Sequence, residues 1–312
     1  MQLSIIIPTY NRMQDLDTCL NSVITQTKLP KEIIIVDDST NNEIEQLIQR
    51  RQNEFKNIEI ALKYFRNMRK KSISISRNLG VKKASGDIIL FLDSDVILEN
   101  TYIEEILKVY HEKSNIIGVQ GYITNSKRNT KLYTFMRKLF FQSHLEKDKC
   151  RVLIQGGTTY PYEPDHIISC EWLSGANCSF RKEIFNEFMY DEKIIIDDND
   201  FGYRIFKKYP GSLLMTPHAR LIHSVSKAGR PNKKKTIYLN EVEREYCFYK
   251  HFNQTVINKI IFFWSCIGFI IFNYKAVTLK QFISAYFYSF KHLSEIKNGD
   301  LDFFDKTISW EA

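Results

Sequence analysis

The sequence predicts an α/β fold in which helices cover both faces of a parallel β-sheet. Through roughly the first 95 residues, apolar runs of strand length alternate with segments of helical spacing. The strand-like runs are apolar almost throughout, which is typical of strands buried on both faces. Alternation of this kind indicates parallel strands joined by crossover helices.

The first strand and helix occupy the first 26 residues. Leu3–Ile7 is apolar and is expected to end at Pro8, which lacks the N–H that a strand interior needs. Residues 13–26 then place apolar side chains three and four positions apart, as one face of a helix requires. These side chains are Leu16, Leu20, Val23 and Ile24.

The following segments repeat this order. Gly86-Asp87 turns the chain into the last strand of the series, and helical spacing returns after it. In chain order, the predicted elements are the strand Glu32–Val36, a helix at 41–52, a strand at 58–64, a helix at 72–84, the strand Ile88–Leu92 and a helix at 99–110.

Polar side chains gather where the predicted strands end. Pro8-Thr9-Tyr10-Asn11 follows the first strand, Asp37-Asp38-Ser39 the second and Asp93-Ser94-Asp95 the fourth. Ligands of open α/β sheets bind beyond the carboxyl ends of the strands. Two carboxylates one residue apart can reach one divalent cation, and Mg²⁺ and Mn²⁺ prefer oxygen ligands. The absence of G-x-G-x-x-G and of a P-loop sequence makes a dinucleotide or P-loop site unexpected.

Composition and charge narrow the class of protein. The 312 residues are 44% hydrophobic, as in a packed globular protein, which disfavours disorder and coiled coil. The net charge of +8 suits a phosphate-bearing ligand or an anionic membrane. The lysines are scattered without a nucleic-acid-binding motif, so we expect no nucleic-acid partner. The six cysteines show no zinc-site spacing, and we interpret them as reduced cytosolic thiols.

Six motifs together resemble one enzyme family. They are IIIPTYNR, VDDST, SRNLGVKKASGDIILFLDSDV, EWLSGANCSF, DDNDFGYR and PHARLIH. Their order and spacing resemble those of the family 2 glycosyltransferases, which are inverting enzymes with a GT-A fold, and the likeness covers roughly residues 1–225. With a basic linker near 227–235, the expected organisation is a catalytic domain at 1–228 and a helical tail at 229–312. The catalytic domain would comprise a nucleotide-sugar half, 1–95, and an acceptor half, 96–228.

The resemblance implies roles for residues of the donor and metal sites. Arg77 would support the donor pocket, although its sequence context also fits a surface salt bridge. His223 would complete the shell of a Mn²⁺ or Mg²⁺ ion, although a lone histidine also fits a structural role. The residues implied to hold the base and ribose of the nucleotide-sugar are Pro8, Thr9, Tyr10 and Asp38, and those implied to contact metal or ribose are Asp95 and Asp93.

The resemblance also implies a general base and an acceptor loop. Asp198 matches the acid that takes the proton of the acceptor hydroxyl. On a helix, its neighbours Asp197 and Asp200 would share a face with Arg204 as a neutralised acidic first turn. The residues implied to lie near the acceptor are Trp172, Gly175 and Asn177. Trp172 fits a core position equally well, and Gly175 would permit close backbone approach.

The C-terminal segment carries a different pattern. Residues 260–272 are apolar, but 13 residues span only ~20 Å as a helix, short of the ~30 Å hydrocarbon core. A second apolar stripe runs at helical spacing from Leu279 to Leu293. Lysines 233–235, 250, 259 and 275 flank the apolar run and favour anionic lipid. We expect peripheral attachment at the cytoplasmic face of the membrane and a glycan or lipid-linked acceptor. The alternative is a helix that covers the catalytic domain.

Two other functions remain open from the residues. A metal-dependent nucleotidyltransferase would also couple a parallel sheet to Mg²⁺, but it would need a Gly-rich phosphate loop where PTYNR stands. A non-catalytic glycan- or membrane-binding protein could use the same scaffold, but the acids at 38, 93, 95 and 198 disfavour loss of activity.

Overall fold

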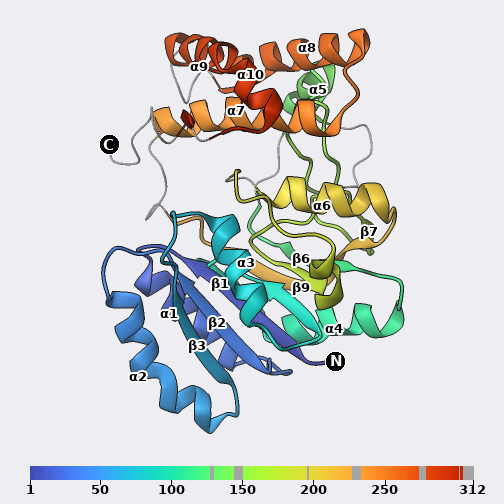
Figure 1. Ribbon diagram of the computed structural model, residues 1–312. Coiled ribbons are helices and arrows are strands. Elements are labelled where there is room, and N and C mark those ends of the chain that lie inside the picture. Colours follow the sequence, from blue (N-terminus) through green and yellow to red (C-terminus); the bar gives the residue numbers. More distant parts are fainter. Residues whose placement is uncertain are drawn as a thin grey trace.

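A mixed β-sheet forms the centre of the molecule (Figure 1). The computed structural model describes residues 1–126, 130–143, 150–194, 197–226, 233–273, 279–301 and 303–304. Within these ranges the sheet has nine strands in the order β3-β2-β1-β4-β8-β6-β9-β5, and β7 pairs with β9. The strands are β1 Leu3–Thr9, β2 Glu32–Asp37, β3 Ala61–Arg66, β4 Ile88–Phe91, β5 Val96–Leu98, β6 Gly118–Ile123, β7 Ile168–Ser169, β8 Cys178–Arg181 and β9 Leu213–His223.

The predicted parallel sheet is confirmed for the four strands within the first 95 residues, and the remainder of the sheet is mixed. β3, β2, β1 and β4 run parallel, as expected of strands joined by α1, α2 and α3. β8 is antiparallel to both β4 and β6. The chain reaches β8 through the loop at 170–177, after α5 and β7.

β1 runs through Pro8, so the predicted strand end at Ile7 is wrong. Pro8 pairs with Val36 of β2, and β1 continues to Thr9. The carbonyl of Ile6 accepts from the N–H of Leu92, so the backbone polar groups of Ile6 point toward β4. Those of Pro8, two residues on, point the same way. The pairing with β4 ends at Ile6, so the missing N–H of Pro8 leaves no ladder bond unmade.

Helices cover both faces of the sheet, as predicted. Ile5 and Ile7 of β1 join one core with α1, α2 and α4, and Ile6 points into a second core with α3 and α6. This alternation explains the continuous apolar strands, because side chains of both parities are buried. The helices are α1 Met13–Ile24, α2 Glu43–Asn57, α3 Ile73–Lys83, α4 Tyr102–Glu112, α5 Lys131–Leu139 and α6 Asp197–Lys208, and a 3₁₀ turn spans Lys182–Asn186.

The C-terminal segment is helical and forms a separate layer (Figure 1). It comprises α7 Lys233–His251, α8 Val256–Asn273, α9 Leu279–Lys291 and α10 Leu293–Asn298. α7 faces α6, and α8 and α9 lie on the side of α7 away from the sheet. Among the described residues, none of the helices combines the length and apolarity that crossing a bilayer requires.

Candidate active site

Strand pairing brings two distant segments together at a candidate metal site. Asp93 and Asp95 lie between β4 and β5, and β5 pairs with β9 so that Val96 faces His223. One ligand atom from each of Asp93, Asp95 and His223 lies within 4.8 Å of the other two. His223 Nε2 is 3.2 Å from Asp95 Oδ1 and 3.8 Å from Asp93 Oδ2. The three residues that the sequence indicated as metal ligands therefore form one cluster.

Asp95 is buried but held in its ionised form. Burial opposes ionisation, yet the hydrogen bond and charge of His223, the N–H of Ser226 at 2.8 Å and the charge of Arg12 outweigh it and lower the pKa of Asp95 to about 2. Arg12 Nη1 lies 3.4 Å from Asp95 Oδ2. Sequence reasoning did not single out Arg12, although it ends the PTYNR motif. Ionised carboxylate oxygens with an imidazole fit Mn²⁺ or Mg²⁺.

The ends of β1 and β2 form the predicted donor end of the site. Asp38 is half-buried and accepts hydrogen bonds from Ser76 Oγ at 2.7 Å and Asn67 Nδ2 at 2.6 Å. Burial raises the pKa of Asp38, and these two hydrogen bonds oppose the change. Asp37 is fully buried and accepts from the Tyr64 hydroxyl at 2.9 Å. Of the two adjacent acids, Asp38 therefore faces the site and Asp37 supports the fold.

Pro8, Thr9 and Tyr10 lie beside Asp38 at the same edge. Pro8 and Thr9 are buried, and the Thr9 hydroxyl has no hydrogen-bond partner among the described residues. The ammonium of Lys71 stands 3.3 Å above the Tyr10 ring centroid. A buried hydroxyl of this kind is suited to a ligand polar group.

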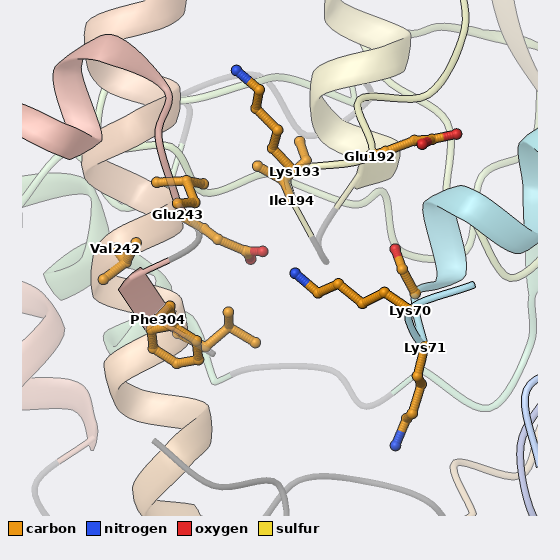
Figure 2. A pocket seen from close by; sticks show the side chains of 11 residues that line it. Lys70, Lys71, Glu192, Lys193, Ile194, Val242, Glu243 and Phe304 are labelled. Atoms are coloured by element: carbon orange, nitrogen blue, oxygen red, sulfur yellow. The ribbon is translucent and has the colours of Figure 1, made fainter. Parts of the chain in front are cut away.

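A pocket borders this donor end and involves the C-terminal helices (Figure 2). Lys70 extends into it from the segment before α3, Lys71 lines the same side, and Val242 and Glu243 of α7 and Phe304 stand opposite. The pocket is therefore lined both by residues before 228 and by residues of the C-terminal helical segment.

Arg77 is buried at the centre of the site. Its guanidinium pairs with Asp197, donates to the carbonyl of Gly175 at 3.1 Å and lies 3.8 Å from Asp93. Burial opposes the charge, but Asp197 and further neighbours raise the pKa of Arg77. The surface salt bridge that its sequence context also allowed is therefore wrong, because Arg77 is 3% exposed.

Gly175 connects Arg77 to Asp198. Its N–H donates to Asp198 Oδ2 at 2.8 Å, while its carbonyl accepts from Arg77. A Cβ at this position would lie 2.2 Å from Arg77 Nη2, so any larger residue would have to displace the Arg77 guanidinium. The groups that approach the Gly175 backbone closely, as expected, are the side chains of Arg77 and Asp198.

Asp198 lies at the start of α6 and is half-buried. Burial raises the pKa of its carboxyl, and this change is opposed by Arg77 and by the N–H groups of Gly175 and Asn199. Asn199 N–H donates to Asp198 Oδ1 at 2.9 Å. The carboxylate is therefore oriented by two backbone donors and is a stronger base than a solvated aspartate.

The two neighbouring acids of α6 have different partners, so the expected shared neutralisation by Arg204 is wrong for Asp197. Asp197 pairs with Arg77, whereas Asp200 accepts from Arg204 Nε at 2.8 Å. The first-turn backbone carries Asp197 toward α3 and Asp200 toward α7. Local spacing could not decide this, because both partners of Asp200 on α7 lie about 50 residues away.

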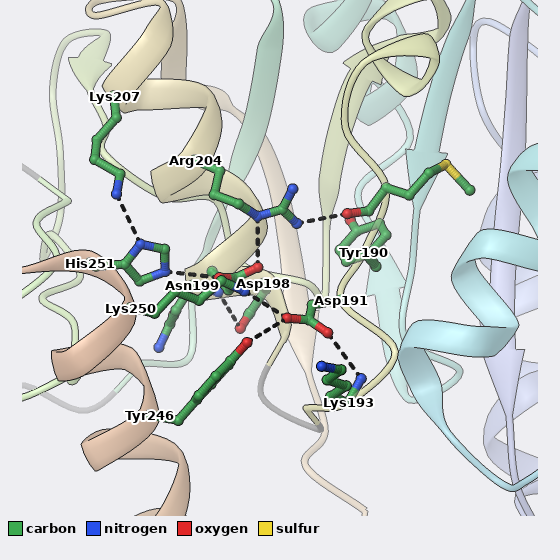
Figure 3. A network of polar contacts seen from close by, with 12 residues as sticks. Tyr190, Asp191, Lys193, Asp198, Asn199, Arg204, Lys207, Tyr246, Lys250 and His251 are labelled. Carbon is green, nitrogen blue, oxygen red and sulfur yellow. Dashed lines mark hydrogen bonds and ion pairs between the residues drawn. The ribbon is translucent and has the colours of Figure 1, made fainter. Parts of the chain in front are cut away.

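Asp200 belongs to a polar network that joins α6 to α7, which we call the α6–α7 clasp (Figure 3). Lys250 Nζ lies 2.7 Å from Asp200 and 2.6 Å from Asp191, and His251 Nε2 lies 2.8 Å from Asp200. The Tyr246 hydroxyl donates to Asp191 at 2.9 Å. The tail is thus tied to the helix that carries Asp198.

Two of the residues predicted to contact the acceptor are buried. Trp172 is 7% exposed, and its indole N–H donates to the carbonyl of Thr159 at 3.1 Å, so the core position is the one it occupies. Asn177 is fully buried, and its amide donates to the carbonyl of Gly121 at 2.9 Å. With no exposed surface, Asn177 supports the loop rather than an acceptor. Residues 227–232 of the basic linker lie outside the described residues.

A nucleotide-binding type of sheet with a D-x-D cluster at its edge and an acid at the start of α6 agrees with the GT-A glycosyltransferase fold that the sequence resemblance implied. The sequence model for "Glycosyl transferase family 2" matches residues 4–174. The chain therefore belongs to the family 2 glycosyltransferases and is an enzyme of that class.

Individual relatives agree with this assignment. An uncharacterized glycosyltransferase, YwdF of Bacillus subtilis, is 29% identical over 232 residues, which cover 73% of this chain and 76% of that protein. Other relatives are longer, and the match spans only 28% of glycosyltransferase GlyA of Streptococcus pneumoniae.

Solved structures share the fold at low identity. The mannosyltransferase PcManGT from Pyrobaculum calidifontis, in complex with GDP-Man and Mn²⁺, has a TM-score of 0.58 at 13% identity. The match covers 97% of this chain and 84% of the PcManGT chain. TarS 1–349 of S. aureus, in complex with UDP-GlcNAc, has a TM-score of 0.59 at 15% identity and covers 97% and 89%. Both likenesses extend across the helical tail.

Proposed function

We propose that this glycosyltransferase moves a sugar from a nucleotide-diphospho-sugar to a hydroxyl of a glycan or lipid-linked acceptor, with inversion at the anomeric carbon. The observation that supports the proposal is the chain of contacts from Asp93 through Arg77 and Gly175 to Asp198, the carboxylate that we assign as the general base. The complexes of PcManGT with GDP-Man and Mn²⁺ and of TarS with UDP-GlcNAc support a nucleotide-sugar donor.

The donor end of the site recognises the nucleotide. Asp38 accepts hydrogen bonds from the ribose hydroxyls, and its own orientation is fixed by Ser76 and Asn67. The buried Thr9 hydroxyl is available to the base or ribose. Asp93, Asp95 and His223 are the residues that would hold Mn²⁺ or Mg²⁺, an ion that neutralises charge on the donor phosphates when it is bound.

Asp198 accepts the acceptor proton. The acceptor oxygen forms a bond to the anomeric carbon as the bond from that carbon to the phosphate oxygen breaks, and the nucleoside diphosphate leaves with the bonding electrons. The hydroxyl proton passes to the Asp198 carboxylate, which Gly175 and Asn199 hold in place. One base and one displacement suffice, so the product has the inverted configuration.

The test is a panel of UDP- and GDP-sugars assayed for nucleotide release with Mn²⁺ or Mg²⁺ and an acceptor. Asp198→Asn should retain donor affinity and lose transfer by ~100-fold or more. Asp165→Asn is the matched control, because Asp165 is an aspartate whose side chain is 92% exposed and which forms an ion pair with His166. Near-parent transfer by Asp198→Asn would remove Asp198 from the role of base, and NMR of a product with retained configuration would refute inversion.

A further inference from the structure

The outer faces of α8 and α9 are apolar and exposed. On α8, exposed side chains recur at helical spacing at Val256, Ile260, Phe263, Ile267 and Ile271. On α9 the same holds for Leu279, Ile283, Phe287 and Phe290, the last two being 71% and 72% exposed. The two helices adjoin, because Phe269 packs edge-on against Phe282 at 5.8 Å. Their exposed stripes therefore adjoin on the outer side of the layer beyond α7 (Figure 1).

α5 extends this surface although it belongs to the catalytic half of the chain. Leu132, Phe135 and Leu139 are at least half exposed. Trp264 of α8 donates its indole N–H to the carbonyl of Leu139 at 2.7 Å and stacks on Phe140 at 5.0 Å. A Cβ on Gly268 would lie 2.4 Å from Phe140 Cβ, so a glycine is needed for this close packing. α5 and α8 are thus fixed against each other with their apolar side chains outward.

The charge on these three helices has one sign. Their sequences contain no aspartate or glutamate, and their basic residues are Lys131, Arg137, Lys138, Lys259, Lys280 and Lys291. A second copy of this chain docked on the same face would oppose basic residues to basic residues. An anionic lipid surface would instead accept both the apolar side chains and the charges.

We propose that the exposed faces of α5, α8 and α9 form one platform that docks the enzyme on an anionic phospholipid surface, with the helices lying in the interface. An apolar surface of this extent on a soluble-type fold marks an interaction site. Docking through these helices is independent of which donor the catalytic site uses. Through α5, a helix that precedes the C-terminal tail in the chain would also contact the lipid surface, which the apolar pattern of the tail alone did not indicate.

The platform also corrects the expected set of lipid-facing lysines. Lys250 belongs to the α6–α7 clasp, and Lys235 is 1% exposed. These two point into the protein, whereas Lys259 on α8 is exposed. The side chains of Lys233, Lys234 and Lys275 lie outside the described residues.

The test is co-sedimentation of the full chain with vesicles of phosphatidylcholine, with or without phosphatidylglycerol. The parent should bind the phosphatidylglycerol vesicles and lose binding as salt rises. Phe287→Glu and, separately, Phe135→Glu should each weaken binding at least about tenfold. Lys280→Gln with Lys291→Gln should weaken it about fivefold per lysine on the anionic vesicles only.

Leu29→Glu is the matched control, because Leu29 is an exposed leucine before β2, at the end of the sheet opposite the site. Donor hydrolysis in solution shows that each variant is folded. If the parent binds vesicles but does not hydrolyse any donor, that result counts against the proposed reaction and not against docking. Absence of parent binding to anionic vesicles overturns the proposal, as does an equal loss in Leu29→Glu. An oligomer in light scattering that Phe287→Glu dissociates, with no vesicle binding, overturns it in favour of a second copy. Parent-like binding by Phe135→Glu removes α5 from the platform.

Discussion

Arg77→Met tests the central ion pair of the site. The change keeps the length of the side chain and removes its charge and its donors. Asp197, which is 1% exposed, then loses the guanidinium that pairs with it, and the carbonyl of Gly175 loses its 3.1 Å hydrogen bond. Breaking one side of a buried ion pair costs about 3–5 kcal/mol, because the remaining charge stays buried.

The same chain offers a matched comparison. Arg69 pairs with Glu192, but their side chains are 61% and 33% exposed, so Arg69→Met should change the free energy of unfolding much less than Arg77→Met. Urea unfolding of both variants and the parent measures the two free energies of unfolding. The double variant Arg77→Met/Asp197→Asn should recover part of the loss, because no unpaired carboxylate remains.

The result that would refute this reasoning is a free-energy loss in Arg77→Met no larger than that in Arg69→Met. That outcome would mean that Asp197 is solvated or protonated in the folded enzyme. A full loss that Asp197→Asn does not reduce would show that packing of Arg77, rather than charge, is what the variant removes.

Three further predictions follow from contacts in the site. Gly175→Ala places a methyl 2.2 Å from Arg77 Nη2 and should lower the transfer rate by about 100-fold, because it displaces Asp198. An unchanged rate in steady-state kinetics would contradict this prediction. Asp200 has a pKa held below its ordinary value, because His251, Arg204 and Lys250 outweigh burial; its stabilisation is therefore present above the unfolded pKa of about 4 and is lost as the pH falls below it. Urea midpoints of the parent should fall with pH in that range more steeply than those of Asp200→Asn, and parallel curves would remove Asp200 from acid unfolding. Chelation with EDTA should abolish transfer, and His223→Ala should raise the Mn²⁺ concentration for half-maximal activity about tenfold or more, whereas exposed His218→Ala on the same strand should not; equal Mn²⁺ curves would exclude His223 as a ligand.

Much of the fold was predictable because its signals are local. The apolar runs of β1, β2 and β4 gave their positions to within two residues, and the helix at Met13–Ile24 matches its spacing. The strand direction beyond β4 was not predictable, since it depends on a loop at 170–177 with no periodic pattern. The α6–α7 clasp was missed for a similar reason, because its members are ordinary charged residues in segments about 50 residues apart.

The sequence by itself determined the order of strands and helices and the chemical character of the strand ends, because periodicity and motif spacing are properties of short segments. The tertiary structure alone decided what each polar residue does. It turned Asp38 toward the site and buried Asp37, paired Arg77 with Asp197, and enclosed Asn177 beneath the loop. Such assignments depend on which distant side chain supplies the opposite charge or excludes water, and folding brings Arg77 and Asp197 together across 120 residues of chain.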